Sequence, residues 1–223
     1  MKIVNFKYGI NMPFFENKAN IMIIENQKAY TDILQNLHTQ SYGGNGDFVL
    51  SEGENQLKIE EEMELVIDPF SLEFNSRKIL GKLYKQLEEL GEDYFVTKEQ
   101  INTNIVNLLD QIASASIYEN IVYNLNLEWK ELFKLYQLKI DKEYASLLEK
   151  LIEYIRIMSY ICRCRILCLV NIKSYLNDSE IQQLYEMAFY NKMYLLLIED
   201  FEKESKDCEQ VYIIDKDLCL IQK

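Results

Sequence analysis

The chain has 223 residues, a hydrophobic fraction of 48% and a formal net charge of −12. This length suits one large domain or a domain with a sizeable insertion, and the hydrophobic fraction excludes an intrinsically disordered chain. The acidic balance argues against diffuse binding to nucleic acid, and no apolar run approaches the ~18 residues that a membrane span needs.

The negative charge is concentrated in one stretch. Residues 51–75 hold eight acids and one base, a net charge of −7, so the other 198 residues carry only −5. An acidic protein can still bind DNA when its bases line one surface and its acids face elsewhere.

The N-terminal residues and the cysteines indicate in which cellular compartment the protein is expected. MKIVNFKYGINMPFF has no continuous apolar segment and no small-residue cleavage site, so no signal peptide is predicted. Five cysteines are an odd number, and reduced thiols are their simplest interpretation. We therefore expect a cytoplasmic protein with no membrane partner.

The N-terminal part predicts a strand followed by a helix and a turn. NIMIIE at 20–25 has the length and composition of a buried strand, and apolar residues repeat every four positions over about 27–37. SYGGNGD at 41–47 predicts a turn because of its three glycines. The chain has no Gly-Lys-Ser or Gly-Lys-Thr, so this loop is not expected to hold a nucleotide.

The next elements are a strand at 63–69 (MELVIDP) and a helix from about Ser76 to Leu90. Ser76 suits the N-cap of that helix, and Gly91 suits a C-terminal stop.

The middle of the chain predicts two long helices. No Gly or Pro occurs between about 98 and 165, and apolar residues from Ile101 to Ile121 fit one helix face with a phase change near Ala115. A second helix fits 141–164. The pair is either a simple helical subdomain or an arm that pairs with other subunits.

After Arg165, strands and helices alternate again. ILCLV at 166–170 and MYLLLIE at 193–199 predict buried strands, with a helix between them that begins near Asn177 and ends near Tyr190. VYIID and LCLI predict an edge hairpin. The fold class is α/β, with a mainly parallel sheet.

The strand at 166–170 ends in Asn171. In α/β nucleotide hydrolases such a strand end often carries an acid that holds magnesium. Here that position has an amide, so the strand lacks the acid that hydrolysis would need.

Oxygen-bearing side chains gather where the first long helix gives way to NLNLEW. Glu119, Asn124, Asn126 and Glu128 sit around a non-helical turn, where alternating oxygen ligands can surround calcium. Solvated polar residues are the alternative interpretation.

Basic residues cluster without forming a run. The candidates for contacts with the DNA backbone are Arg77, Lys78, Lys82, Arg163 and Arg165. The first three share much of one helix surface, and phosphate contacts need only positive charge. A scattered, solvated set is the alternative.

The order of these parts resembles the Csn family, the small type II-A CRISPR-associated adaptation protein. The resemblance extends from the opening VNF to the tail VYIIDKDLCLI, and includes ELVIDPFSLEFNSRKIL and SIYENIVYNLNLEW. Its strongest portion begins at LLEKLIEYIRIMSYICRCRILCLVNIKSYLND.

The resemblance implies an α/β head related to P-loop ATPases without the nucleotide loop, and an inserted α-helical leg. The implied boundaries are 1–92 and 165–223 for the head and 93–164 for the leg. It also implies a non-enzymatic homotetrameric ring that binds double-stranded DNA ends during spacer acquisition. Partners would be the CRISPR integrase proteins and the RNA-guided effector nuclease.

Calcium in the head would support such a ring. The resemblance carries over Glu25, Glu119 and Glu128 as ligands, whereas other acidic positions of the family read Val122, Asn124, Asn126 and Lys130 here. Asparagine brings oxygen but no charge, so a weaker site is expected.

Two rival functions remain. One is a protein-interaction scaffold in the adaptation complex without direct DNA binding, which the net charge of −12 favours. The other is a nucleotide-dependent enzyme of P-loop ancestry, against which the missing Gly-Lys-Ser/Thr motif counts.

Overall fold

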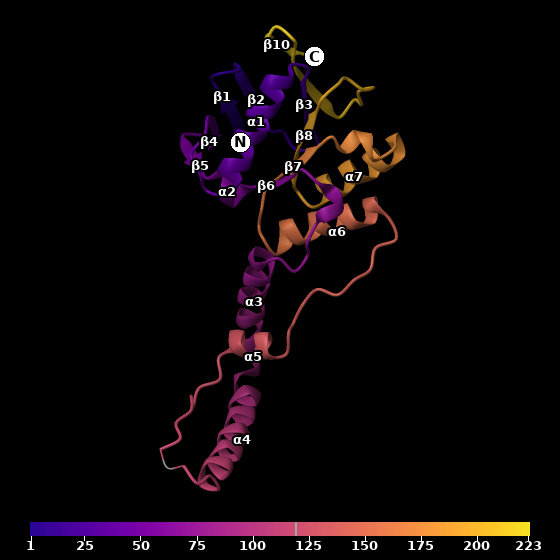
Figure 1. Ribbon diagram of the computed structural model, residues 1–223. Coiled ribbons are helices and arrows are strands. Elements are labelled where there is room, and N and C mark those ends of the chain that lie inside the picture. Colours follow the sequence, from indigo (N-terminus) through magenta and orange to yellow (C-terminus); the bar gives the residue numbers. More distant parts are fainter. Residues whose placement is uncertain (119) are drawn as a thin grey trace. The chain divides into compact units, whose positions relative to one another are not determined.

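The computed structural model describes residues 1–118 and 120–223 (Figure 1). The chain divides into two compact units: a head unit of Met1–Phe74 with Lys142–Lys223, and a helical unit of Asn75–Asp141. The inserted unit therefore differs from the expected 93–164 at both ends. In the part of the chain that is described, no helix combines the length and the apolar character needed to cross a membrane.

The head unit is built on a six-stranded sheet in the order β10-β9-β3-β8-β7-β6. The strands pair in parallel except for β10, which lies antiparallel to β9 at the edge, so the predicted mainly parallel sheet and its edge hairpin are confirmed. The strand bounds are β3 Ala19–Ile24, β6 Met63–Val66, β7 Ile166–Val170, β8 Tyr194–Glu199, β9 Glu209–Ile214 and β10 Leu220–Gln222.

A second sheet, in the order β2-β1-β4-β5, is entirely antiparallel and was not predicted. Its strands are only three to five residues long, too short for a clear alternation of apolar and polar residues. Their bounds are β1 Lys2–Asn5, β2 Ile10–Pro13, β4 Phe48–Glu52 and β5 Asn55–Leu57.

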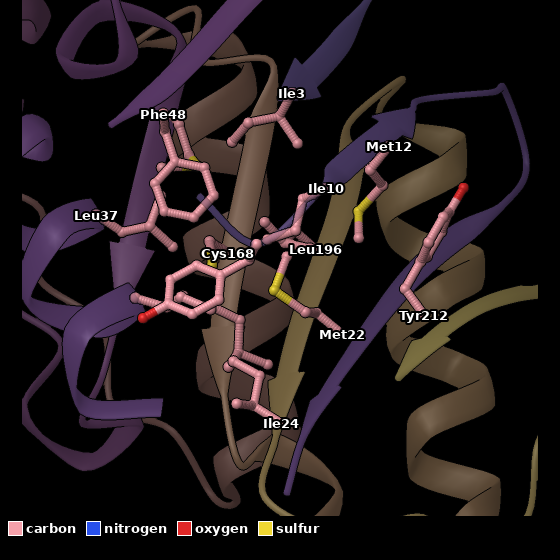
Figure 2. Close-up of a cluster of buried hydrophobic side chains, with 14 of the residues drawn as sticks. Ile3, Ile10, Met12, Met22, Ile24, Leu37, Phe48, Cys168, Leu196 and Tyr212 are labelled. Atoms are coloured by element: carbon pink, nitrogen blue, oxygen red, sulfur yellow. The ribbon is translucent and has the colours of Figure 1, made fainter. Parts of the chain in front are cut away.

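The core of the head unit joins both sheets. Figure 2 shows buried side chains of the antiparallel sheet, such as Ile3 and Phe48, with side chains of the parallel sheet, such as Met22 and Leu196. Leu37 of helix α1 (Gln27–Ser41) completes the cluster. Burying a side chain of this size contributes about 1.5–3 kcal/mol, which explains why strands of marginal length are held in place.

The other helices of the head unit are α2 Ile59–Glu62, α6 Leu147–Tyr160 and α7 Asp178–Tyr190, with 3-10 turns η1 Pro69–Ser71 and η3 Ile172–Ser174. Helix α7 begins with a capping box: the Asn177 side chain accepts backbone N–H groups while Glu180 bonds back to the Asn177 N–H. The start and end predicted for this helix are confirmed.

Helix α6 is shorter than the predicted 141–164. Ser146 caps it by accepting the N–H of Glu149 at 3.1 Å, so the residues before Ser146 are not helical. Its buried stripe includes Leu151, Ile155 and Met158, and the helix contacts α7. This packing places α6 in the head unit.

The helical unit contains α3 Arg77–Gly91, the 3-10 turn η2 Glu92–Tyr94, α4 Phe95–Ser114 and α5 Trp129–Leu135. Ser76 caps α3 as predicted. Gly91 does not stop the chain's helical course, which continues through η2 into α4. Its lack of a side chain instead makes room for Trp129, because a Cβ there would lie 2.7 Å from the indole Cε2.

Helix α4 ends at Ser114, where the sequence pattern changes phase, and not near Ile121.

Candidate functional site

The first candidate surface is an exposed basic face on α3. Arg77, Lys78 and Lys82 are all exposed on this helix, so the structure brings these three predicted residues together. Lys85, which the sequence reasoning missed, continues the set, because positions 78, 82 and 85 follow the spacing of one helix face. That i, i+4, i+7 spacing was the available signal. We call Arg77, Lys78, Lys82 and Lys85 the basic face of α3.

The two other predicted DNA contacts belong to the head unit. Arg163 is exposed and has a left-handed backbone with φ of 56° just after α6. Arg165 lies immediately before β7. Its Nε donates to Glu62 Oε2 at 2.6 Å, and its Nη1 donates to Glu52 Oε2 at 2.8 Å. These hydrogen bonds raise the pKa of Arg165, so the side chain is engaged within the head unit.

The predicted calcium ligands lie in different parts of the chain. Glu25 is an exposed residue of the head unit directly after β3, whereas Asn124, Asn126 and Glu128 are exposed residues of the helical unit. The Asn124 side-chain oxygen accepts the N–H of Asn126 at 3.0 Å. Glu119 lies outside the described residues.

Calcium takes six to eight oxygen ligands, with carboxylates supplying most of the charge. Among residues 1–118 and 120–223, no three His, Cys, Asp or Glu side chains come together as a metal site. The described residues therefore offer calcium no cluster of three carboxylates, the ligands that supply most of the charge.

At the carboxyl end of β7 the backbone turns at Asn171 and remains hydrogen-bonded to the neighbouring strand. Asn171 has φ of 53°, and its N–H donates to the Ile198 carbonyl at 2.8 Å. The acid that ends the neighbouring strand is Glu199, the last residue of β8, which is buried and accepts the Lys173 N–H at 3.1 Å. Sequence reasoning missed Glu199. Its signal was a carboxylate placed directly after the apolar run LLLI.

The Lys173 side chain points away from this edge. Its Nζ lies 2.7 Å from Glu209 Oε1 at the amino end of β9, and the two side chains are only 7% and 0% exposed. Tyr185 of α7 donates its hydroxyl proton to the same carboxylate at 2.7 Å. The ammonium group of Lys173 is therefore engaged in a buried ion pair.

The helical unit also carries an apolar stripe on α4. Ile101, Ile105, Leu108 and Ile112 are 39–60% exposed, and none of the 20 residues of α4 is buried. Their spacing of four, three and four residues is that of a coiled-coil seam. We call these four residues the apolar stripe of α4.

Comparison with known proteins identifies the family of this chain. The family model described as CRISPR-associated protein (Cas_Csn2) matches residues 40–218. The chain is 24% identical to CRISPR-associated protein Csn2 of Enterococcus faecalis over 222 residues, which cover 97% of each chain. It is 26% identical to CRISPR-associated protein Csn2 of Streptococcus agalactiae over 223 residues, 98% of this chain and 96% of the relative. The resemblance inferred from the sequence is confirmed, and the chain belongs to the Csn2 family of CRISPR-associated proteins.

Proposed function

We propose that this chain acts in CRISPR spacer acquisition as a non-enzymatic, ring-forming protein that binds the ends of double-stranded DNA. Membership of the family implies a role in CRISPR adaptation. The basic face of α3 is the observation on which DNA binding rests.

The position of these bases on α3 is unfavourable for the helix itself. Arg77 and Lys78 occupy its first turn, which holds no acid, although the helix dipole favours negative charge there by about 0.3–1 kcal/mol per group. No acid occurs before Glu88 in this helix. Arg77 and Lys78 therefore oppose the helix dipole, and four exposed cations on one helix are well suited to contact a phosphate backbone.

Self-association is supported by the apolar stripe of α4. Helices gain most of their stability in proteins from packing of an apolar face, and this face has no buried residue within the chain. A second copy supplies the same seam and covers it. We propose that such pairing contributes to a homotetrameric ring, whose inner surface is basic and whose outer surface carries the acids.

The proposal excludes nucleotide hydrolysis for two reasons beyond the missing motif. The N–H groups of Gly43 and Gly44 in the glycine loop donate to Gln40 and Thr39 carbonyls at 3.1 and 3.0 Å, so they close the end of α1 and do not face a ligand. At the strand end, Asn171 stands where hydrolases place an acid. We propose that the head is a P-loop relative that keeps the scaffold alone.

The proposals that the protein binds calcium and that it acts with other proteins rest on the family resemblance. The proposed partners are the integrase proteins and the RNA-guided effector nuclease of the same CRISPR system. The proposed role of calcium is to support the ring.

A mobility-shift comparison of linear and covalently closed duplex of equal length tests the proposal. It is run at two salt concentrations, with calcium and with chelator. Binding to linear DNA alone supports threading through a ring, and the affinity should fall steeply with salt. Equal binding to both forms indicates an open groove. Absence of binding to either form would reject the clamp and favour the scaffold, with which the net charge of −12 agrees.

A further inference from the structure

Asn171 and Glu199 lie side by side at the carboxyl edge of the parallel sheet. Val170 of β7 pairs with Ile198 of β8, so the residues that follow them are neighbours. The Asn171 N–H donates to the Ile198 carbonyl at 2.8 Å, and the Lys173 N–H donates to Glu199 Oε1 at 3.1 Å. The Glu199 carboxyl group thus joins the end of β8 to η3.

Two buried side-chain oxygens here have no hydrogen-bond partner among the described residues: Glu199 Oε2 and Asn171 Oδ1. The hydroxyl of Tyr30 on α1 is buried at the same place. Glu199 is 1% exposed, so water does not replace the missing partner easily. The Asn171 side chain lowers the pKa of Tyr30 against the larger rise caused by burial, which places that hydroxyl close to the amide.

The donors among these three side chains are the Asn171 amide nitrogen, which approaches the Tyr30 hydroxyl, and that hydroxyl itself. Neither is bonded to Glu199 Oε2, so an ionised Glu199 keeps one buried acceptor without a donor. A buried acceptor without a donor is costly, and a buried charge is more so. A proton on Glu199 removes the charge and supplies a donor at the carboxyl group itself.

The surrounding charges do not offset a Glu199 carboxylate by a direct ion pair. The Lys203 ammonium group donates to Ser174 Oγ at 3.1 Å, and the Lys173 ammonium group is bonded to Glu209. Burial raises the pKa of Glu199, and the Lys173 N–H lowers it by less. The other groups that act electrostatically on Glu199 are Lys203, Asp200, Tyr30 and Tyr185.

We propose that Glu199 is a proton-binding site: the folded protein holds a proton on this carboxyl group, which donates to the oxygen of Asn171 and fastens η3 to the end of β8. Loss of the proton leaves a charge in the core and loosens the turn at Asn171. The site makes the conformation of this edge sensitive to pH, independently of whether the protein binds DNA.

The direction of the pH dependence follows from linkage. The folded state keeps this proton to a higher pH than the unfolded chain, in which a glutamate titrates near about 4.3. The contribution to stability is therefore complete below that pH and is lost as the pH rises through the higher value of the folded state.

The direct test is a carbon NMR titration of the glutamate side-chain carboxyl groups in the full-length protein. The Glu199 resonance is assigned through its own bonds to the backbone, so the assignment does not depend on a variant. A midpoint well above about 4.3 supports the proposal. A midpoint at or below that value would overturn it.

The second test compares Tm as a function of pH for the wild type, Glu199→Gln and Glu204→Gln. Glutamine imitates the protonated carboxyl group, so Glu199→Gln should raise Tm by about 2–4 °C above the folded-state midpoint. That gain should vanish below the folded-state midpoint, where the wild type carries its own proton. Glu204, an exposed glutamate that does not act on Glu199, is the matched control, and Glu204→Gln should follow the wild type. A Glu199→Gln curve that runs parallel to the wild type, or below it at every pH, contradicts the proposal.

Discussion

Arg165 holds Glu62 by both its side chain and its backbone. Its Nε donates to Glu62 Oε2 at 2.6 Å, and its backbone N–H donates to the Glu62 carbonyl at 3.0 Å. This double contact ties the end of α2 to the start of β7, although the two residues are 103 positions apart. Arg165, which the sequence suggested as a DNA contact, therefore links two elements of the head unit.

Replacing Arg165 should therefore affect folding more than DNA binding. We expect Arg165→Ala to lower the free energy of unfolding by about 1 kcal/mol, since the pair is partly exposed and solvent screens it. Urea denaturation measures this change. Arg163→Ala removes a neighbouring exposed arginine and should leave stability within about 0.5 kcal/mol of the wild type. Equal stabilities for the two variants would refute the structural role of Arg165.

The basic face of α3 should control DNA affinity. Each phosphate contact contributes about 0.9 to the slope of log affinity against log salt concentration, so the triple variant with Lys78, Lys82 and Lys85 replaced by Gln should reduce that slope by up to about 3. Binding of linear duplex at several salt concentrations measures it. Lys216→Gln, an exposed lysine of the head unit, is the control. An unchanged slope in the triple variant would place the DNA elsewhere.

The apolar stripe of α4 should control assembly. We expect Leu108→Asp to shift the molar mass from light scattering toward the monomer, because a carboxylate in the seam between two helices loses its hydration. Asn107→Asp adds the same charge on a different, exposed side of α4 and should retain the wild-type mass. If both variants keep that mass, the stripe is not the self-association face.

The close approach of Gly91 and Trp129 makes a prediction about the helical unit. A Cβ at position 91 would lie 2.7 Å from the indole, so Gly91→Ala should destabilise the protein by about 1–3 kcal/mol. At Gly81 of the same helix nothing lies within 4 Å of the added carbon. Gly81→Ala should instead stabilise the helix by about 0.5–1 kcal/mol. Chemical denaturation of both variants tests the contrast, and a loss of similar size at both positions would rule out the packing explanation.

Calcium should bind weakly. The stretch around Asn124 and Asn126 offers amides where a strong site has carboxylates, and weak sites of this kind have dissociation constants of about 10⁻⁴–10⁻³ M. We expect no rise in Tm below about 0.1 mM calcium, and any rise above it to disappear in Glu128→Gln. Micromolar binding would show that the residues around this turn form a stronger site than their charges suggest.

Local patterns in the sequence predicted the elements whose signals are themselves local. The apolar runs of β3, β7 and β8 are long enough to indicate buried strands without reference to their partners. The start of α7 is determined by side chains three residues apart, Asn177 and Glu180. The order of these parts along the chain also indicated the family, because the order of segments is retained in relatives whose single motifs are no longer diagnostic.

Other features were decided by partners far away in the sequence. The four strands of the antiparallel sheet are too short to be recognised alone and are held by the core that they share with β3 and α1. The sequence alone suggested that Gly91 ends a helix, whereas the structure shows that its missing side chain makes room for Trp129. The sequence alone also suggested Arg165 as a DNA contact, whereas the structure pairs it with Glu52 and Glu62.

The sequence by itself determined the mainly parallel sheet, the starts of α1, α3 and α7, and the family, because hydrophobic periodicity, capping residues and collinear order act over short distances or along the chain. Only the tertiary structure decided which charges are engaged and which are exposed. Glu199 and Lys173 are ordinary charged residues in the sequence, and they become buried groups only because β8, η3 and α7 exclude water around them.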